Sequence, residues 1–142
     1  MSSADRRLAR LIDLFARSVD KAHVAEAAAN RRAEAAAHAW DAAEEAYRSA
    51  VGEPSLHDTD PETLEADAAR RVYLRALAER RHREADVAHV DAKTAHAHLV
   101  DARIEHAKLE RFHELKLERA EEEERKLERR ESDAYAARLA RK

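Results

Sequence analysis

The chain has 142 residues, of which 40% are charged and only 4% aromatic, and its formal net charge is −3 with neutral histidines. This length favours a single domain covering residues 1–142, and the alanine-rich, charged composition favours long helices or a coiled coil. The near-neutral charge argues against a nucleic-acid partner, which would favour a basic excess. The chain has no cysteine, which excludes disulfides and thiolate metal sites, and no run of about 18 apolar residues that could span a membrane. These features are compatible with an intracellular protein.

The only glycine and both prolines lie between Gly52 and Pro61. Gly52 can adopt the left-handed conformation that ends a helix, and Pro54 cannot continue one. Asp60 offers a side-chain acceptor as N-cap to a helix whose first residue is Pro61. The sequence therefore predicts a turn over residues 52–60 between two helices.

A first helix is predicted over residues 4–51, with Ser2 or Ser3 as its cap and Asp5 in its first turn. A repeat of 3.5 residues runs through it, and we call this row of residues the first seam. Twelve of its thirteen positions are apolar, which is typical of a left-handed coiled coil. The positions are Leu8, Ile12, Phe15, Val19, Ala22, Glu26, Ala29, Ala33, Ala36, Trp40, Ala43, Tyr47 and Ala50.

A second helix is predicted over residues 61–141, with a broader apolar face than the first. Its main row, the second seam, consists of Leu74, Ala78, Ala85, Ala88, Ala92, Ala95, Leu99, Ala102 and Leu109. A neighbouring row consists of Val87, Val90, Ala97, Val100, Ile104 and Ala107.

The two seams predict an all-α fold, an antiparallel two-helix coiled-coil hairpin with a longer, overhanging C-terminal helix. Folding the chain about residue 56 places Trp40 near Val72 and Leu8 near Ile104. The start of the first helix then lies opposite about residue 108 of the second helix. About 33 residues of the second helix remain uncovered, which at about 1.5 Å per residue extend near 50 Å.

The sequence offers little catalytic chemistry. A single glycine excludes a glycine-rich phosphate loop. Two histidine motifs place polar side chains along one helix face, but the histidines of each motif are about 10.5 Å apart along the axis, too far for one metal ion. We expect no catalytic residue, no metal site and no cofactor, and hence no enzyme. The motifs are His82, Asp86 and His89, and His106, Glu110 and His113.

A short helix, a Gly/Pro turn and a longer charged helix together resemble the stalk proteins of type III secretion systems, flagellar FliJ and injectisome YscO. Residues 102–110 resemble the family's basic and alanine-rich run before a Leu-Glu pair. Residues 130–138 resemble its C-terminal Asp-x-aromatic-Ala-x-Arg ending, with Ala134 where the family commonly has an acid, and residues 8–15 are similar to its opening apolar run.

The resemblance implies a cytoplasmic coupling protein, peripheral to the inner-membrane secretion apparatus and a monomer when free. It would link a hexameric secretion ATPase to the export gate, and some members of the family also escort chaperones. The residues implied at the ATPase are Leu8, Ile12, Tyr135, Arg138 and Leu139. Those implied at the export gate are Trp40, Tyr47, Tyr73 and Leu77.

Three alternatives stay open at this point. Trp40 and Tyr47 are either core anchors or interface residues. The uncovered C-terminal helix is either a solvated tip or a rod that enters a partner. The whole chain could instead be a generic coiled-coil adaptor or spacer, which would associate with itself or with another coil.

Overall fold

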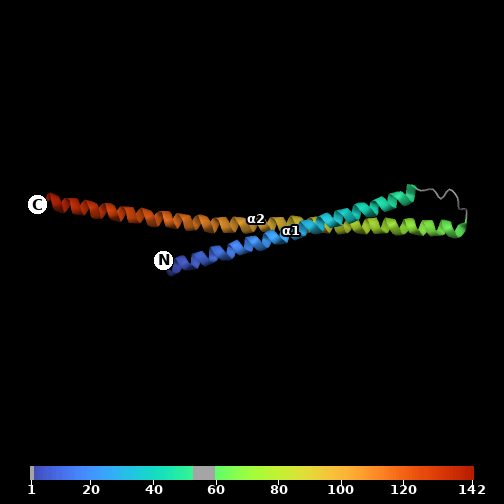
Figure 1. Ribbon diagram of the computed structural model, residues 1–142, viewed down its shortest axis with the longest axis horizontal. Coiled ribbons are helices and arrows are strands. Elements are labelled where there is room, and N and C mark those ends of the chain that lie inside the picture. The colour runs from blue at the N-terminus through green and yellow to red at the C-terminus, as the bar shows by residue number, and fades with distance from the viewer. Residues whose placement is uncertain (1, 53–59) are drawn as a thin grey trace. The chain divides into compact units, whose positions relative to one another are not determined.

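The computed structural model describes residues 2–52 and 60–142. Two α-helices make up these residues: α1 spans Ser3–Gly52 and α2 spans Pro61–Ala140 (Figure 1). The fold is the expected all-α antiparallel hairpin with a longer C-terminal helix, and each helix begins and ends within one residue of its predicted bounds.

Side-chain caps explain where both helices begin. The backbone N–H of Asp5 donates to Ser2 Oγ at 3.1 Å, and the backbone N–H of Ser2 donates back to Asp5 Oδ2 at 3.0 Å. This reciprocal pair satisfies two donors at the start of α1. At the start of α2, the N–H of Glu62 donates to Asp60 Oδ1 at 3.4 Å, and Pro61 takes the first helical position.

The end of α1 differs from the prediction. Gly52 is the last helical residue, and its φ is not positive, so it does not form the left-handed cap. The remainder of the predicted turn, residues 53–59, lies outside the described residues.

Contacts group the chain into two units, which we treat separately. The hairpin unit is Asp20–Val100, and the terminal unit comprises Met1–Val19 and Asp101–Lys142. In each unit a segment of α1 packs antiparallel against a segment of α2, so that each unit has its own stretch of both seams.

Both seams are confirmed by burial. All thirteen positions of the first seam and all nine of the second are buried or half-buried. In the hairpin unit the most buried side chains are Ala29 and Leu99, each 2% exposed, and in the terminal unit Leu8 is buried. The neighbouring row of α2 is not part of the core, because Val87, Val90 and the rest of that row are exposed.

The predicted register of the two helices is wrong. In the hairpin unit, Arg71 Nε donates to the carbonyl oxygen of Ala50 at 3.2 Å, and the Trp40 ring contacts His82 rather than Val72. The residue numbers of two facing residues therefore sum to 121 or 122, whereas folding the chain about residue 56 predicts a sum of 112.

The error arose from placing the fold of the chain at residue 56. Because Ala50 faces Arg71, residues 61–69 of α2 precede the part of the hairpin unit that α1 covers. In the terminal unit the expected partner of Leu8, Ile104, is an exposed residue.

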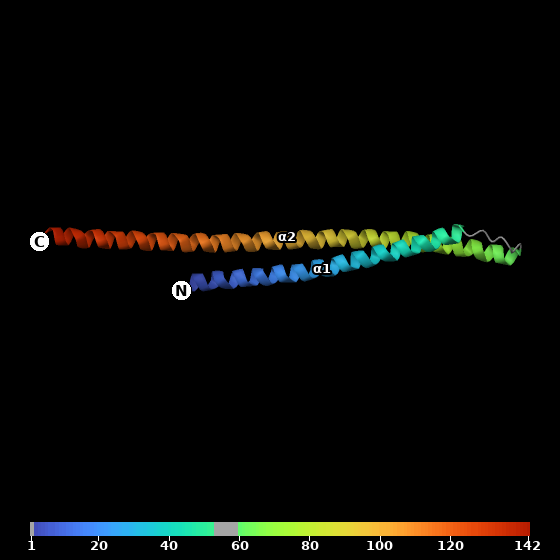
Figure 2. The ribbon, with the colours of Figure 1, turned by 45° about the horizontal axis from the view of Figure 1, so that its top comes forward.

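The uncovered part of α2 is consequently shorter than predicted. In the terminal unit, Lys116 Nζ donates to Asp5 Oδ1 at 2.9 Å, next to the start of α1. Residues 117–140 then continue as helix without α1 beside them (Figures 1 and 2). At 1.5 Å per residue this segment is about 36 Å long, and every residue in it is exposed.

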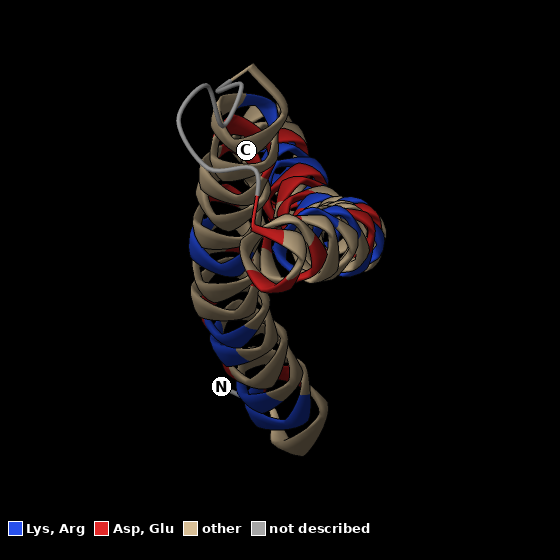
Figure 3. Ribbon diagram, turned by 90° about the vertical axis from the view of Figure 1, so that its right-hand side faces the viewer, with Lys and Arg blue, Asp and Glu red and all other residues tan. Residues whose placement is uncertain are grey.

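The surface of both helices carries both signs of charge. Bands of lysine and arginine and bands of aspartate and glutamate are both visible among the uncharged residues of the ribbons (Figure 3). Within the described residues, neither helix contains a segment apolar enough to cross a membrane.

Candidate interaction sites

An open groove in the hairpin unit is formed by aromatic side chains of α1 and charged side chains of α2. Trp40 and Tyr47 are seam residues that line one wall, and both are half-buried, so part of each side chain packs between the helices and part remains accessible. The groove has a volume of about 400 Å³. Its other lining residues are Glu44, Arg75, Ala78, Glu79, His82 and Arg83.

The charges in this groove are largely paired within each helix. Arg75 Nε lies 3.3 Å from Glu79 Oε1, and Arg48 Nη2 lies 3.3 Å from Glu44 Oε1. These exposed pairs contribute little to stability, so the groove offers an apolar floor with polar edges that remain accessible to a partner.

The four residues implied at the export gate do not form one patch. Trp40 and Tyr47 line the groove, whereas Tyr73 and Leu77 do not. Tyr73 is 64% exposed and Leu77 is half-buried. The sequence grouped them by distance along the chain, but their positions around the helices separate them.

The five residues implied at the ATPase are also divided. Leu8 is buried and Ile12 half-buried in the terminal unit, where α2 covers them. Tyr135, Arg138 and Leu139 lie on the uncovered part of α2 and are exposed. Since α1 begins beside Lys116, the two groups do not meet.

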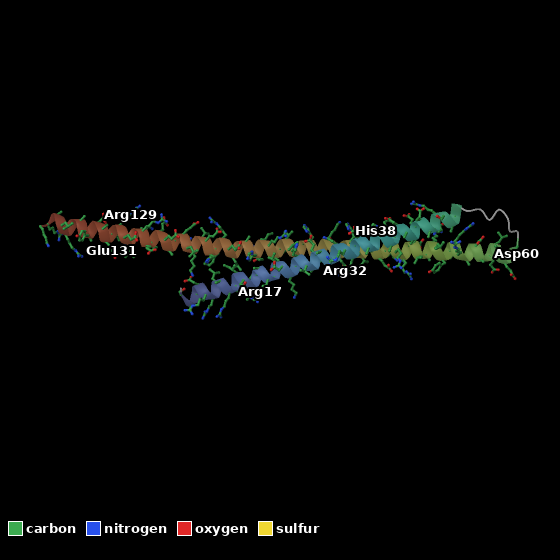
Figure 4. The ribbon with its side chains drawn as sticks, in the orientation of Figure 1. Arg17, Arg32, His38, Asp60, Arg129 and Glu131 are labelled. Atoms are coloured by element: carbon green, nitrogen blue, oxygen red, sulfur yellow. The ribbon has the colours of Figure 1, made fainter. Side chains whose placement is uncertain are left out.

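The uncovered helix is held by ion pairs along its own surface. Arg125 Nη2 lies 3.7 Å from Glu121 Oε2, and Lys126 Nζ lies 3.3 Å from Glu123 Oε1. Figure 4 shows side chains projecting above and below the ribbon of this segment, where Arg129 and Glu131 are labelled. Such pairs each add a few tenths of a kcal/mol to a helix that lacks a packing partner.

A polar notch interrupts the alanine-rich seam of the hairpin unit. Its centre is Glu26, the one charged residue of the first seam, whose side chain is only 20% exposed. Glu26 Oε2 lies 3.4 Å from His96 Nδ1 without hydrogen-bond geometry, so this buried oxygen has no hydrogen-bond partner among the described residues. Asn30, His89 and Lys93 also line the notch.

A second polar contact joins the helices in the terminal unit. Asp5 accepts hydrogen bonds from the Ser2 hydroxyl at 2.6 Å and from Lys116 Nζ at 2.9 Å. The Ser2 hydroxyl, then Lys116, then the Ser2 amide hold the pKa of Asp5 well below its ordinary value.

The histidine motifs make local contacts. His82 Nδ1 lies 3.3 Å from Asp86 Oδ2, and His106 Nε2 lies 3.6 Å from Glu110 Oε1. No group of three or more His, Asp or Glu side chains suited to a metal ion occurs in the described ranges 2–52 and 60–142.

The interhelical polar contacts are the features that the sequence analysis missed. Glu26 was visible as the exception in the first seam, and His82, His89 and His96 recur every seven residues. Together these signals could have indicated a polar edge facing α1. No protein-family model matches the chain, and no curated protein or solved structure is significantly similar to it.

Proposed function

We propose that this chain is a coupling protein of a type III secretion export apparatus, which links a hexameric secretion ATPase to the export gate. One feature carries the proposal: α2 continues for residues 117–140 as a charged helix that its own chain leaves uncovered. A helix of this length loses little by entering a partner, because no intramolecular packing has to be broken.

Tyr135, Arg138 and Leu139 are the contact residues on this uncovered helix, where two apolar side chains and a guanidinium group face solvent. Exposed aromatic and arginine side chains are the types that most often dominate binding energy at interfaces. Leu8 and Ile12 are covered by α2 and hold the start of α1 against it, so they do not belong to the proposed contact.

The groove lined by Trp40 and Tyr47 is the contact site for the export gate or for an escorted chaperone. Its apolar floor and accessible charged edges correspond to the core and rim of a transient protein interface. Tyr73 supplies a separate exposed contact in the same unit.

Binding to the purified secretion ATPase tests the proposal. The full chain should co-purify with the hexamer and raise its ATP hydrolysis rate. The double variant Tyr135→Ala with Leu139→Ala should lose both effects, whereas Phe112→Ala with Leu115→Ala, a matched loss of exposed apolar surface outside the uncovered segment, should keep them. Equal binding by both variants would contradict the proposed contact.

The rival function is a coiled-coil spacer that associates with itself. It is favoured by the exposed row of Val87, Val90 and Val100 on α2 of the hairpin unit, which a second helix could cover. Light scattering separates the two functions, because the coupling protein should be a monomer and the spacer a stable dimer.

A further inference from the structure

The middle of the hairpin unit specifies its register weakly. The first seam from Ala29 to Ala36 and the facing residues of α2 are alanines, and Ala36 faces Ala85 in the observed register. A slide of α1 by one heptad would bring Ala36 opposite Ala78, another seam alanine. Because alanine then still meets alanine, the buried apolar area in this region changes little.

Polar side chains with the same seven-residue spacing lie along one edge of α2. The Trp40 ring meets His82 edge to face, and Glu26 contacts His96. Each contact has an equivalent one heptad away, since Arg75 lies seven residues before His82, and His89 lies seven residues before His96. We call this row of residues the polar edge of α2, and it consists of Arg75, His82, His89 and His96.

The alternative partners already line the same grooves. Arg75 shares the groove of Trp40 and His82, and His89 shares the notch of Glu26 and His96. After a slide of one heptad, Trp40 would stack with a guanidinium group and Glu26 would pair with another imidazole. Both are favourable contacts of similar kind.

The connection between the helices allows the slide in one direction only. In the observed register about nine residues of α2 precede the point opposite Gly52, roughly 13 Å along the helix. The slide that pairs Trp40 with Arg75 reduces this offset to about 3 Å. The opposite slide increases it to about 23 Å, which would require the eight residues between Gly52 and Pro61 to be almost fully extended.

We propose that the hairpin unit has two registers, the observed one and one in which α1 is displaced by a heptad so that Trp40 meets Arg75 and Glu26 meets His89. The alanine seam lets the helices slide, and the polar edge of α2 defines the two stopping points. Because α1 and α2 are each one continuous helix, the same displacement breaks the contact between Lys116 and Asp5, so the displaced register is the minor one. The two registers differ by one heptad. A ligand that binds one register more tightly would increase its population at the expense of the other. Neither register depends on which partner the protein binds.

Disulfide trapping tests the two registers, since the chain has no cysteine of its own. Three double variants combine Ala36→Cys with a cysteine on α2: Ala85→Cys reports the observed register, Ala78→Cys the displaced one and Ala92→Cys the opposite slide. In a glutathione buffer the first pair should form the major cross-link, the second a minor one and the third none.

Substitutions on the polar edge should move this distribution. His96→Ala should raise the Ala36–Ala78 cross-link relative to Ala36–Ala85 by about two- to fivefold, the range that partly exposed ion pairs support, and His89→Ala should lower it similarly. The Ala36–Ala85 cross-link also shows that each variant remains folded.

Two results would overturn the proposal. The first is an Ala36–Ala78 cross-link that stays undetectable in the His96→Ala background while Ala36–Ala85 forms normally. The second is equal formation of the Ala36–Ala78 and Ala36–Ala92 cross-links, which would indicate unspecific sliding without defined registers.

Discussion

The imidazole of His82 meets the indole of Trp40 edge to face, with 4.3 Å between the ring centroids and an angle of 82° between the ring planes. Edge-to-face geometry directs the positive edge of one ring at the negative face of the other. Because Trp40 is the one tryptophan of the chain and a seam residue, this contact ties the register of the hairpin unit to the groove that a partner would use.

Truncating Trp40 and Tyr73 should distinguish a half-buried aromatic side chain from an exposed one. Trp40→Ala should lower the free energy of unfolding by about 2 kcal/mol, less than the 3–5 typical of a fully buried aromatic, because Trp40 is half-buried. Tyr73→Ala removes a 64% exposed ring and should stay within about 0.5 kcal/mol. Urea titration measures both, and a large loss for Tyr73→Ala would place that ring in a core.

The contrast between the seam and the neighbouring row of α2 gives a second test. Leu99→Ala should cost about 2–4 kcal/mol, because this side chain is 2% exposed and its removal leaves a cavity. Val90→Ala, on the exposed row of the same unit, should change stability by less than about 0.5 kcal/mol. If the two losses are similar in thermal unfolding, a second copy must cover the valine row.

The helix boundaries and both seams could be predicted from the sequence because their causes are local. Capping by Ser2 and Asp60 depends on neighbouring residues alone, and an apolar repeat of 3.5 residues determines which side of a helix is covered. The glycine and the two prolines between Gly52 and Pro61 indicated where the first helix ends and the second begins, although the predicted left-handed cap at Gly52 was wrong.

The register could not be predicted, because it depends on differences between long-range contacts that are nearly equal. Folding the chain about residue 56 differs from the observed register by nine or ten residues, which is not a whole heptad, and it places Leu8 opposite Ile104, an exposed residue. The contacts that reveal the observed register are polar and cross between helices, such as that of Arg71 with the carbonyl oxygen of Ala50. The implied gate residues are divided because proximity to the turn in the sequence does not determine the side of the helix: Tyr73 is exposed and does not line the groove of Trp40.

The pKa of Asp5 provides a test by titration. Hydrogen bonds to the carboxylate lower its pKa in the folded state below the ordinary value of 3.8, so their contribution to stability is present above pH 3.8 and is lost as the pH falls below it. NMR titration of the Asp5 carboxyl should give a midpoint below 3.8. Ser2→Ala should raise this midpoint more than Lys116→Ala, because the Ser2 hydroxyl has the larger effect. An unchanged midpoint in both variants would show that the cap and the interhelical contact are not formed.

The uncovered helix gives the most direct test of function. Deletion of residues 131–142 removes Tyr135, Arg138 and Leu139 but none of the buried or half-buried residues. The melting temperature of the helical pair should therefore stay nearly unchanged, with a loss of ellipticity in proportion to the residues removed. Stimulation of the secretion ATPase should disappear.

The matched control for this deletion is Leu8→Ala in the full chain, which weakens packing between α1 and α2 in the terminal unit while leaving the uncovered helix intact. Leu8→Ala should lower the melting temperature, since burial of a leucine contributes about 2 kcal/mol or more, and should retain ATPase stimulation below that temperature. The opposite pattern, with full stimulation by the deleted chain and none by the folded Leu8→Ala variant, would move the partner site from α2 to the start of α1.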